Sequence, residues 1–242
     1  MLLLRSLIFN AVFYLNLALR LIPAIGTFLL PRRAIIRTAQ AWGRSSVSLM
    51  ERIVGTKAEF RGLENIPSGG LLVAAKHHSF WETFALLPIF DDPTFVMKRE
   101  LSWIPVFGWL TTKAGMIPID RGGGAAAIAR MNRHALQAVR DGRQILIFPE
   151  GTRRSAGAEP AYRNGIAHLY RQLGVPCLPV ALNSGAFWPR RSFLRRPGTI
   201  VVEILPPIQP GLEREAFMRE LQDRIETATN RLLDEARAAN GR

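Results

Sequence analysis

The chain has little cysteine and no long uninterrupted apolar run. Of its 242 residues, only Cys177 is a cysteine, which excludes an internal disulfide and fits a reducing compartment. Cys177 lies in the apolar run 175–182, so we expect a buried packing residue rather than a nucleophile. The longest uncharged stretch near the N-terminus, Ser6–Leu19, has 14 residues, whereas a helix that crosses a bilayer needs roughly 20. A simple transmembrane helix is therefore not the first expectation.

Several short patterns that identify common binding sites are also missing. The chain has no zinc-finger spacing and no aromatic signature of an RNA-binding module, so nucleic acid is not an expected partner. The Gly-x-Gly-x-x-Gly and Walker patterns are absent, so Gly122–Gly124 is expected to open a helix rather than to bind phosphate. The Gly-x-Ser-x-Gly turn of many hydrolases is absent as well, which makes Ser79 a poor candidate for a nucleophile.

Acidic residues are scarce relative to basic ones. The chain has 32 Lys and Arg against 19 Asp and Glu, a formal charge of +13 and a pI of about 11.3. Such a charge indicates an anionic partner, which is nucleic acid, anionic lipid or a phosphorylated substrate. Because the arginines are scattered among apolar segments, an anionic membrane surface is favoured. Hydrophobic residues make up 48% of the chain, which is enough for one large domain with a substantial core.

The first 30 residues are strongly apolar but are interrupted by polar residues and a proline: Arg5, Asn10, Asn16, Arg20 and Pro23. We expect a membrane anchor that lies on or dips into one leaflet, built from two short helices broken near Pro23. One tilted span over residues 6–30 and a buried core helix are the alternatives. A signal peptide is disfavoured, because its basic N-terminal region would hold only one arginine and no clear small-residue cleavage site follows. A basic collar for anionic lipid would follow the anchor, at Arg32, Arg33 and Arg37.

The remainder of the chain alternates between expected strands and expected helices. Short apolar runs predict strands at 57–60, 71–75, 94–97, 116–119, 144–148, 177–182 and 199–204. Helical spacing predicts helices at 38–54, 80–90, 125–139, 165–173 and 212–239. A further helical stretch with aromatic residues is expected after Glu100, ending at about Thr112. This alternation predicts an α/β fold with a mixed, largely parallel sheet flanked by helices. We expect two parts, an N-terminal membrane-associated helical segment (1–54) and one catalytic domain (55–242).

His77 and Glu82 follow the apolar run 71–75 and are the most informative pair of residues. A histidine in contact with a carboxylate can act as a general base that the carboxylate orients. Five residues along one helix separate two side chains by roughly 140°, so the pair can meet only if His77 precedes the helix. Ser79 and Glu82 match a capping box, with Ser79 at the N-cap. A helix that starts there would disfavour protonated His77 and leave a neutral base.

The local pattern leaves other interpretations of this segment open. Glu82 can cap the helix without any further role, and His77 can simply pack against its neighbours. His78 lies four residues from Glu82 and is a rival base. His134 and His168 lie in expected helices without acidic partners in a matching pattern, as surface or core histidines do.

Two arginines follow apolar runs further along the chain. Arg121 ends the sequence Gly-Met-Ile-Pro-Ile-Asp-Arg (115–121), and Arg153 ends Phe-Pro-Glu-Gly-Thr-Arg (148–153). Both are expected just beyond the ends of strands, where loops build the sites of α/β proteins. Arginine binds phosphate in bidentate fashion, although a surface salt bridge explains either residue equally well alone. Together with His77, the arginines indicate an enzyme that activates a hydroxyl beside a bound phosphate.

These segments resemble the glycerolipid acyltransferase family, specifically its bacterial 1-acyl-sn-glycerol-3-phosphate (lysophosphatidic acid) acyltransferases. That family carries Asn-His-x-Ser-x-x-Asp, Gly-x-x-x-Ile-Asp-Arg, Phe-Pro-Glu-Gly-Thr-Arg and Val-Pro-x-x-Pro-Val blocks. This chain has Lys-His-His-Ser-Phe-Trp-Glu at 76–82, the two arginine blocks at 115–121 and 148–153, and Val-Pro-Cys-Leu-Pro-Val at 175–180. Four blocks in the family's order, within residues 55–210, make the resemblance specific.

The resemblance implies a role for each block. His77, which falls on the family's histidine, would remove the proton from the free hydroxyl of a lysolipid acceptor, and Glu82 would orient His77. The acceptor's glycerol phosphate would be held by Arg121, Glu150, Gly151, Thr152 and Arg153. Ser79 and Pro179 would shape the site or contribute to binding of the acyl donor. The acyl group would come from a thioester of coenzyme A or acyl carrier protein, without a metal, a further cofactor or a covalent acyl-enzyme.

Two residues depart from the family's pattern. Glu82 is one methylene longer than the family's Asp, so the turn must absorb the difference in length. Lys76 replaces the family's Asn and adds a positive charge, which would help to keep His77 neutral or would indicate a changed acceptor. The implied fold, an α/β sheet with an N-terminal helical membrane motif in some members, agrees with the organisation expected from the residues.

The expected function is acyl transfer to the sn-2 hydroxyl of lysophosphatidic acid, which gives phosphatidic acid for phospholipid synthesis. The expected partners are a lysophospholipid acceptor, an acyl thioester donor and an anionic membrane surface at the cytoplasmic face of the bacterial inner membrane. The first alternative is the same chemistry on lyso-ornithine lipid or another lysolipid. The second is a membrane-binding protein that keeps the fold without activity, which an intact His77 and two arginines disfavour.

Overall fold

The structure is a computed structural model that describes residues 1–120, 122–239 and 241. Within these residues the strands form a seven-stranded sheet with the order β1-β7-β6-β2-β5-β3-β4. The strands are β1 (Thr56–Arg61), β2 (Leu71–Ala75), β3 (Pro93–Lys98), β4 (Ile117–Ile119), β5 (Gln144–Ile147), β6 (Cys177–Leu182) and β7 (Gly198–Ile204). β6 and β7 run antiparallel, and the other neighbouring pairs are parallel. The expected mixed, largely parallel sheet is confirmed.

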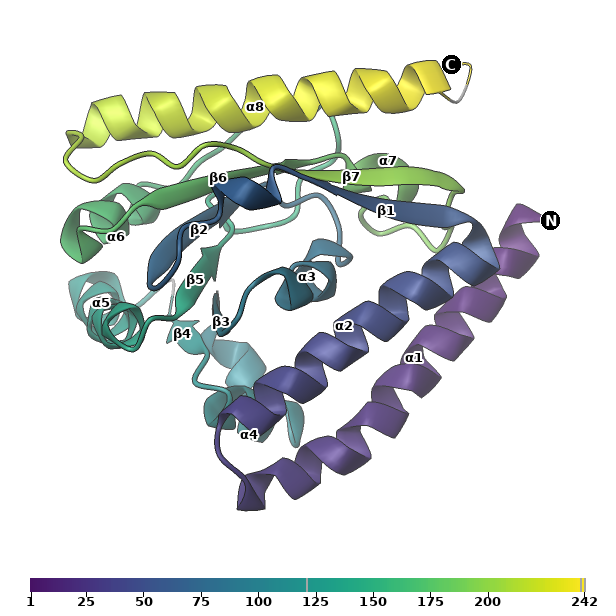
Figure 1. Ribbon diagram of the computed structural model, residues 1–242, viewed down its shortest axis with the longest axis horizontal. Helices are drawn as coiled ribbons and strands as arrows, with labels where there is room; N and C mark the ends of the chain where they lie inside the picture. Colours follow the sequence, from purple (N-terminus) through teal and green to yellow (C-terminus); the bar gives the residue numbers. More distant parts are fainter. Residues whose placement is uncertain (121, 240, 242) are drawn as a thin grey trace.

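Helices precede, connect and follow these strands (Figure 1). The α-helices are α1 (Leu2–Gly26), α2 (Arg33–Val54), α3 (Glu82–Ala85), α4 (Phe107–Lys113), α5 (Gly124–Arg140), α6 (Gly165–Leu173), α7 (Ser184–Phe187) and α8 (Arg214–Ala239). Short 3-10 helices are η1 (Thr27–Leu29), η2 (Leu63–Asn65), η3 (Leu87–Ile89) and η4 (Arg99–Trp103).

β2 shows why the sheet is covered on both faces. All of its residues are buried, and successive side chains of a strand point to opposite faces. Leu71 and Val73 enter a core shared with α2 and α3, whereas Leu72 and Ala74 enter a second core shared with α5, α6 and α8. The long α8 runs along β6 and β7 (Figure 1). The sheet is therefore the middle layer between two layers of helices.

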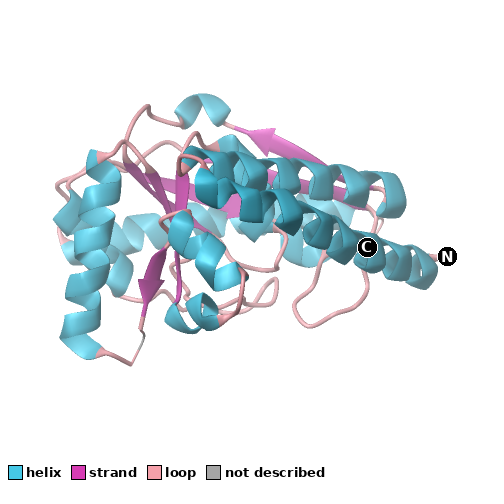
Figure 2. Ribbon diagram, turned by 90° about the horizontal axis from the view of Figure 1, so that it is seen from below, coloured by secondary structure: helices cyan, strands magenta, loops and turns pink. Residues whose placement is uncertain are grey.

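α1 and α2 form an antiparallel helical hairpin beside the sheet (Figures 1 and 2). One face of α1 holds the hairpin to the domain through Phe9 and Phe13, which are buried in the first core. The ring of Phe13 lies 5.4 Å from the ring of Phe84, and the ring of Phe9 lies 5.6 Å from the ring of Trp188. The hairpin thus shares the hydrophobic core that lies on this face of the sheet.

The expected break of the N-terminal segment near Pro23 is wrong. α1 continues through Pro23 to Gly26, and η1 follows it. A proline removes one backbone hydrogen bond of a helix, but this one lies in the last turn of α1, where few further bonds depend on it. Ala24, next to Pro23, is buried in a cluster with α2 and α4.

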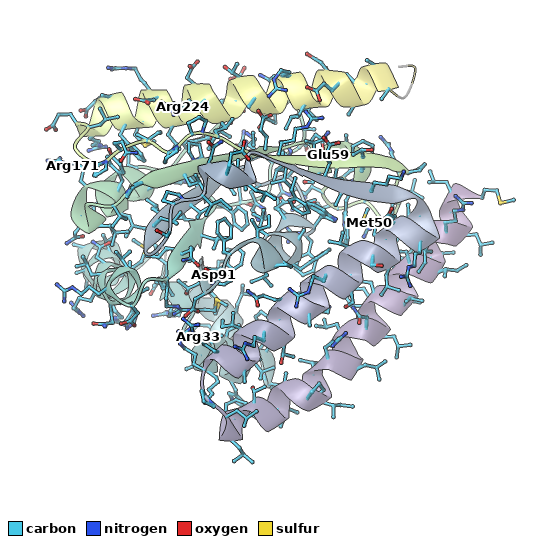
Figure 3. The ribbon with its side chains drawn as sticks, in the orientation of Figure 1. Arg33, Met50, Glu59, Asp91, Arg171 and Arg224 are labelled. Carbon is cyan, nitrogen blue, oxygen red and sulfur yellow. The ribbon has the colours of Figure 1, made fainter. Side chains whose placement is uncertain are left out.

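The opposite face of α1 is apolar and exposed. Leu2–Leu29 is long and apolar enough to cross a membrane by length and composition, with a mean hydropathy of 1.7, and only 22% of its most apolar 18-residue window is buried. A core helix is mostly buried, so α1 differs from one on most of its surface. Side chains made mostly of carbon project from the outer side of α1 (Figure 3). The exposed large ones include Leu3, Leu4, Leu7, Leu15, Leu19 and Ile22.

Candidate active site

The residues predicted to form the site meet at one edge of the sheet. Strands β2 to β6 run in the same direction, so their carboxyl ends lie at a common edge, where α/β proteins bind ligands. His77 follows β2, Asp120 follows β4, Phe148 follows β5 and Ser184 follows β6. Segments that are far apart in the sequence are therefore brought together at this edge by the topology.

His77 and Glu82 are in contact. The Nδ1 atom of His77 lies 2.9 Å from Oε1 of Glu82. The same Oε1 accepts hydrogen bonds from the backbone N–H groups of His78 and Ser79, both at 2.7 Å. The other oxygen, Oε2, accepts from the hydroxyls of Ser79 at 3.0 Å and Ser184 at 2.8 Å. This carboxylate is fully buried, and its fixed donors determine its position.

These contacts define the charge of Glu82 and the tautomer of His77. Burial opposes ionisation of Glu82, but the hydrogen bond and charge of His77, with Ser79 and Ser184, hold its pKa below the usual value. An ionised carboxylate only accepts hydrogen bonds, so Nδ1 of His77 carries the proton that it donates. In the neutral imidazole, Nε2 of His77 is then the nitrogen without a proton, and this atom is able to accept a proton from a substrate.

The turn between β2 and α3 differs in detail from the expected capping box. α3 begins at Glu82 itself, and the Ser79 hydroxyl accepts a hydrogen bond from the N–H of Trp81 at 2.9 Å. The reciprocal bond from the N–H of Ser79 to Glu82 is present. The expected helix at 80–90 is divided into α3 and η3, with Pro88 inside η3, because proline cannot donate a backbone hydrogen bond. Glu82 therefore both orders the turn and contacts His77.

His78, the rival base, does not pair with Glu82 through its ring. Its backbone N–H binds Glu82, whereas its side chain is buried. Burial lowers the pKa of His78 to about 4. The charge of Glu82 opposes this shift, and the charges of Lys76 and His77 add to it. His77 thus has the orienting carboxylate, and His78 is a buried neutral histidine.

The segment after β5 contacts His77 directly. The ring of Phe148 stacks on the imidazole, with centroids 3.8 Å apart and planes at 12°. The N–H of Arg154 donates to the carbonyl oxygen of His77 at 2.9 Å. The sequence did not indicate Phe148, Arg154 or Ser184 as site residues, because these contacts depend on which strands are neighbours of β2.

The predicted phosphate ligands of this segment have different surroundings. Gly151 has a positive φ of 67°, and its N–H closes a turn on the carbonyl of Phe148 at 2.9 Å. Thr152 and Arg153 are exposed, and Arg153 forms no ion pair with any residue that the structure describes. The guanidinium of Arg153 is therefore available to an anionic ligand.

Glu150 is buried rather than exposed. Its Oε1 atom accepts a hydrogen bond from Nζ of Lys76 at 3.2 Å and lies 3.7 Å from Nε of Arg154. Burial raises the pKa of Glu150, and the charge of Lys76 opposes this shift. A buried carboxylate with these partners is poorly placed to bind a phosphate directly.

The other predicted residues lie around this centre. Arg121 lies outside the described residues, and the neighbouring Asp120 forms an ion pair with Arg99 at 2.8 Å. Pro179 is buried in β6 opposite Ala74 of β2, so it supports the strand that carries the His77 turn. Cys177 is fully buried, and burial raises the pKa of its thiol, as expected for a packing residue.

Comparisons with known proteins identify the family of the chain. Residues 57–183 match the family model described as Acyltransferase. A 1-acyl-sn-glycerol-3-phosphate acyltransferase of Pseudomonas aeruginosa is 37% identical over 199 residues, covering 82% of this chain and 77% of the relative. One from Limnanthes alba is 31% identical over 175 residues, covering 72% of this chain and 62% of the plant protein.

A solved structure shares the fold. The crystal structure of the 1-acyl-sn-glycerophosphate (LPA) acyltransferase PlsC from Thermotoga maritima matches with a TM-score of 0.80. The match covers 96% of this chain and 98% of that chain at 20% identity. With the family model covering more than half of its length, the chain belongs to the acyltransferase family.

Proposed function

We propose that the protein transfers a fatty acyl group to the sn-2 hydroxyl of lysophosphatidic acid and so forms phosphatidic acid. The observation that carries this proposal is the His77–Glu82 pair at the carboxyl edge of the sheet, 2.9 Å apart. The relatives' names support the choice of acceptor, because they are called 1-acyl-sn-glycerol-3-phosphate acyltransferases.

The proposed reaction is direct transfer. Nε2 of His77 accepts the proton of the acceptor hydroxyl while the hydroxyl oxygen attacks the thioester carbonyl. The new C–O ester bond forms as the C–S bond breaks, and the leaving thiolate takes up the proton from His77. Glu82 stabilises the imidazolium between these two transfers. The donor is an acyl thioester of coenzyme A or of acyl carrier protein, and no metal or further cofactor takes part.

The phosphate of the acceptor is proposed to bind at Arg153 and Arg121. Arg153 supports this because its exposed guanidinium follows the turn that stacks Phe148 on His77. Gly151 and Thr152 would contribute through the shape of this turn. Glu150 would act indirectly, through Lys76, since its side chain is buried. Ser79 and Pro179 would hold the catalytic turn and its supporting strand.

The acceptor lyso-ornithine lipid is the less favoured alternative. Lys76 was the departure that suggested a changed acceptor, but its charge is paired with Glu226 and Glu150 inside the protein. Lys76 therefore gives no reason to expect a different headgroup.

The exposed face of α1 supports membrane attachment, which we assign to the cytoplasmic face of the inner membrane.

Acyl transfer by purified protein tests the proposal. Lysophosphatidic acid and lyso-ornithine lipid are offered with labelled acyl-coenzyme A or acyl carrier protein, and the lipid products are separated. Labelled phosphatidic acid is the expected product. Transfer to lyso-ornithine lipid alone would identify that lipid as the acceptor in place of lysophosphatidic acid. Transfer to neither lipid would contradict the proposed function.

Arg153→Ala tests the phosphate contact in the same assay. We expect the KM for lysophosphatidic acid to rise roughly tenfold or more, as loss of a charge-assisted hydrogen bond implies, with little change in the KM for the thioester. Arg140→Ala is the matched control, because Arg140 is an exposed arginine at the end of α5, where the chain returns to the opposite edge of the sheet. An equal rise for both substrates would exclude the phosphate contact.

A further inference from the structure

Lys76 is buried although lysine is normally exposed. It lies between β2 and His77, and only 2% of its side chain is exposed. Its Nζ atom lies 2.7 and 3.0 Å from the two carboxylate oxygens of Glu226 and 3.2 Å from Oε1 of Glu150. A buried ammonium requires such partners, because an unpaired charge inside a protein is strongly unfavourable.

Tyr162 completes this arrangement. Its hydroxyl donates a hydrogen bond to Oε1 of Glu226 at 2.9 Å. Its ring centroid lies 5.9 Å from Nζ of Lys76, within the range of a cation–π contact. Burial raises the pKa of Tyr162, and the charge of Glu226 adds to the shift, so the hydroxyl remains a donor. We call Lys76, Glu150, Tyr162 and Glu226 the Lys76 cluster.

The Lys76 cluster connects the catalytic turn to distant parts of the chain. Glu226 belongs to α8, Tyr162 to the segment before α6, and Glu150 to the turn after β5. That turn also contacts His77 through the Phe148 ring and the Arg154 N–H. The backbone on both sides of His77 is therefore held, by Lys76 before it and by Glu82 after it.

We propose that Lys76, Tyr162 and Glu226 are positioning residues, which fix His77 and the 148–154 turn relative to α8. This inference rests on the proposed acyl transfer, since positioning matters for a reacting base. It explains how a lysine is accommodated where the family's pattern has Asn: the carboxylate of Glu226 compensates its charge. α8, which contributes no predicted site residue, thereby becomes part of the support of the active site.

Glu226→Gln tests this role in the full-length protein, because it keeps the side chain's shape and removes its charge. We expect kcat to fall roughly ten- to a hundredfold, as a small misplacement of a catalytic group implies, with KM for both substrates little changed. Asp223→Asn is the matched control, because Asp223 is an exposed carboxylate on the same helix. The kcat of this variant is expected to stay within about twofold of the wild-type value.

Hydrogen–deuterium exchange measures the same effect without catalysis. Peptides covering 76–84 and 148–156 should exchange faster in Glu226→Gln than in wild type and Asp223→Asn. If exchange is faster in Glu226→Gln but the wild-type protein transfers no acyl group, the proposed function is overturned and the positioning contacts are still supported. Unchanged exchange and unchanged kcat in folded Glu226→Gln would overturn the positioning role.

Tyr162→Phe provides a second variant if Glu226→Gln does not fold. It removes one hydroxyl and retains the ring beside Lys76, so the core packing is kept. We expect a smaller fall in kcat and a smaller rise in exchange at the same peptides. Wild-type values for both measurements in Tyr162→Phe would then overturn the proposal.

Discussion

At the scale of single residues, the buried carboxylate of Glu82 fulfils two roles that the sequence presented as alternatives. It accepts the backbone N–H groups that order the turn after β2, and it also contacts Nδ1 of His77. The longer side chain of Glu, compared with the family's Asp, is accommodated because the turn places His77 before α3 rather than on it. Order in the turn and orientation of the His77 ring therefore have a common origin.

His78 gives a prediction for the pH dependence of stability. Its pKa is about 4 in the folded protein and roughly 6.5 in the unfolded chain, so the unfolded chain binds the proton first as pH falls. The free energy of unfolding should therefore decrease between about pH 6.5 and pH 4, by up to about 3 kcal/mol from this residue. Urea unfolding at several pH values measures the slope.

Two variants make the test specific to His78. His78→Gln removes the titrating group and should flatten the decrease over this pH range. His134→Gln changes an exposed histidine on α5 and should keep the wild-type slope. The same slope in all three proteins would show that His78 does not titrate as expected.

The sequence predicted the local part of the site better than the rest. His77 and Glu82 could be paired because they are five residues apart, and their geometry depends on one turn. Ser184 and Phe148 could not, because their contacts require β6 and β5 to flank β2. The burial of Glu150 was also not predictable, since its partner Lys76 is in the turn after β2.

At the scale of elements, most strands and long helices follow from apolar patterns bounded by glycine or proline. The bounds of β2, β6 and α6 are those expected. β2 and β6 are compact apolar runs, and α6 is an amphipathic segment that ends at Gly174. α7 was not expected, and α3 is shorter than expected. Helices of one turn depend on tertiary contacts more than on their own sequence.

The hairpin of α1 and α2 provides a prediction about membrane attachment. Leu15 and Leu19 are exposed on α1, at 57% and 58%, so replacing both with Ser should leave the core intact. We expect partitioning to anionic phosphatidylglycerol vesicles to weaken roughly tenfold or more, from the lost apolar contact. Vesicle flotation measures binding, and thermal unfolding checks that the Tm is unchanged.

Leu63→Ser is the matched control for this pair. Leu63 is an exposed leucine, at 48%, in η2 before β2, away from the N-terminal hairpin in sequence. Its replacement should not affect vesicle binding. Wild-type binding by Leu15→Ser/Leu19→Ser would show that this face of α1 is not the membrane contact.

At the scale of the whole molecule, the sheet topology is what converts scattered sequence blocks into one site. The segments that follow β2, β4, β5 and β6 reach the same edge because β2 to β6 are parallel. The hairpin is joined to this domain through Phe9 and Phe13, so membrane attachment would hold the site in a fixed relation to the lipid surface. The net charge of +13 favours an anionic membrane and an anionic acceptor alike.

In the proposed reaction, His77 is the base that activates the acceptor hydroxyl. The most direct test measures acyl transfer to lysophosphatidic acid by wild type, His77→Ala and His134→Ala at equal folded concentration. We expect His77→Ala to lose roughly three orders of magnitude or more in kcat, while His134→Ala retains wild-type activity. Retention of activity by folded His77→Ala would contradict the role of His77 as the base.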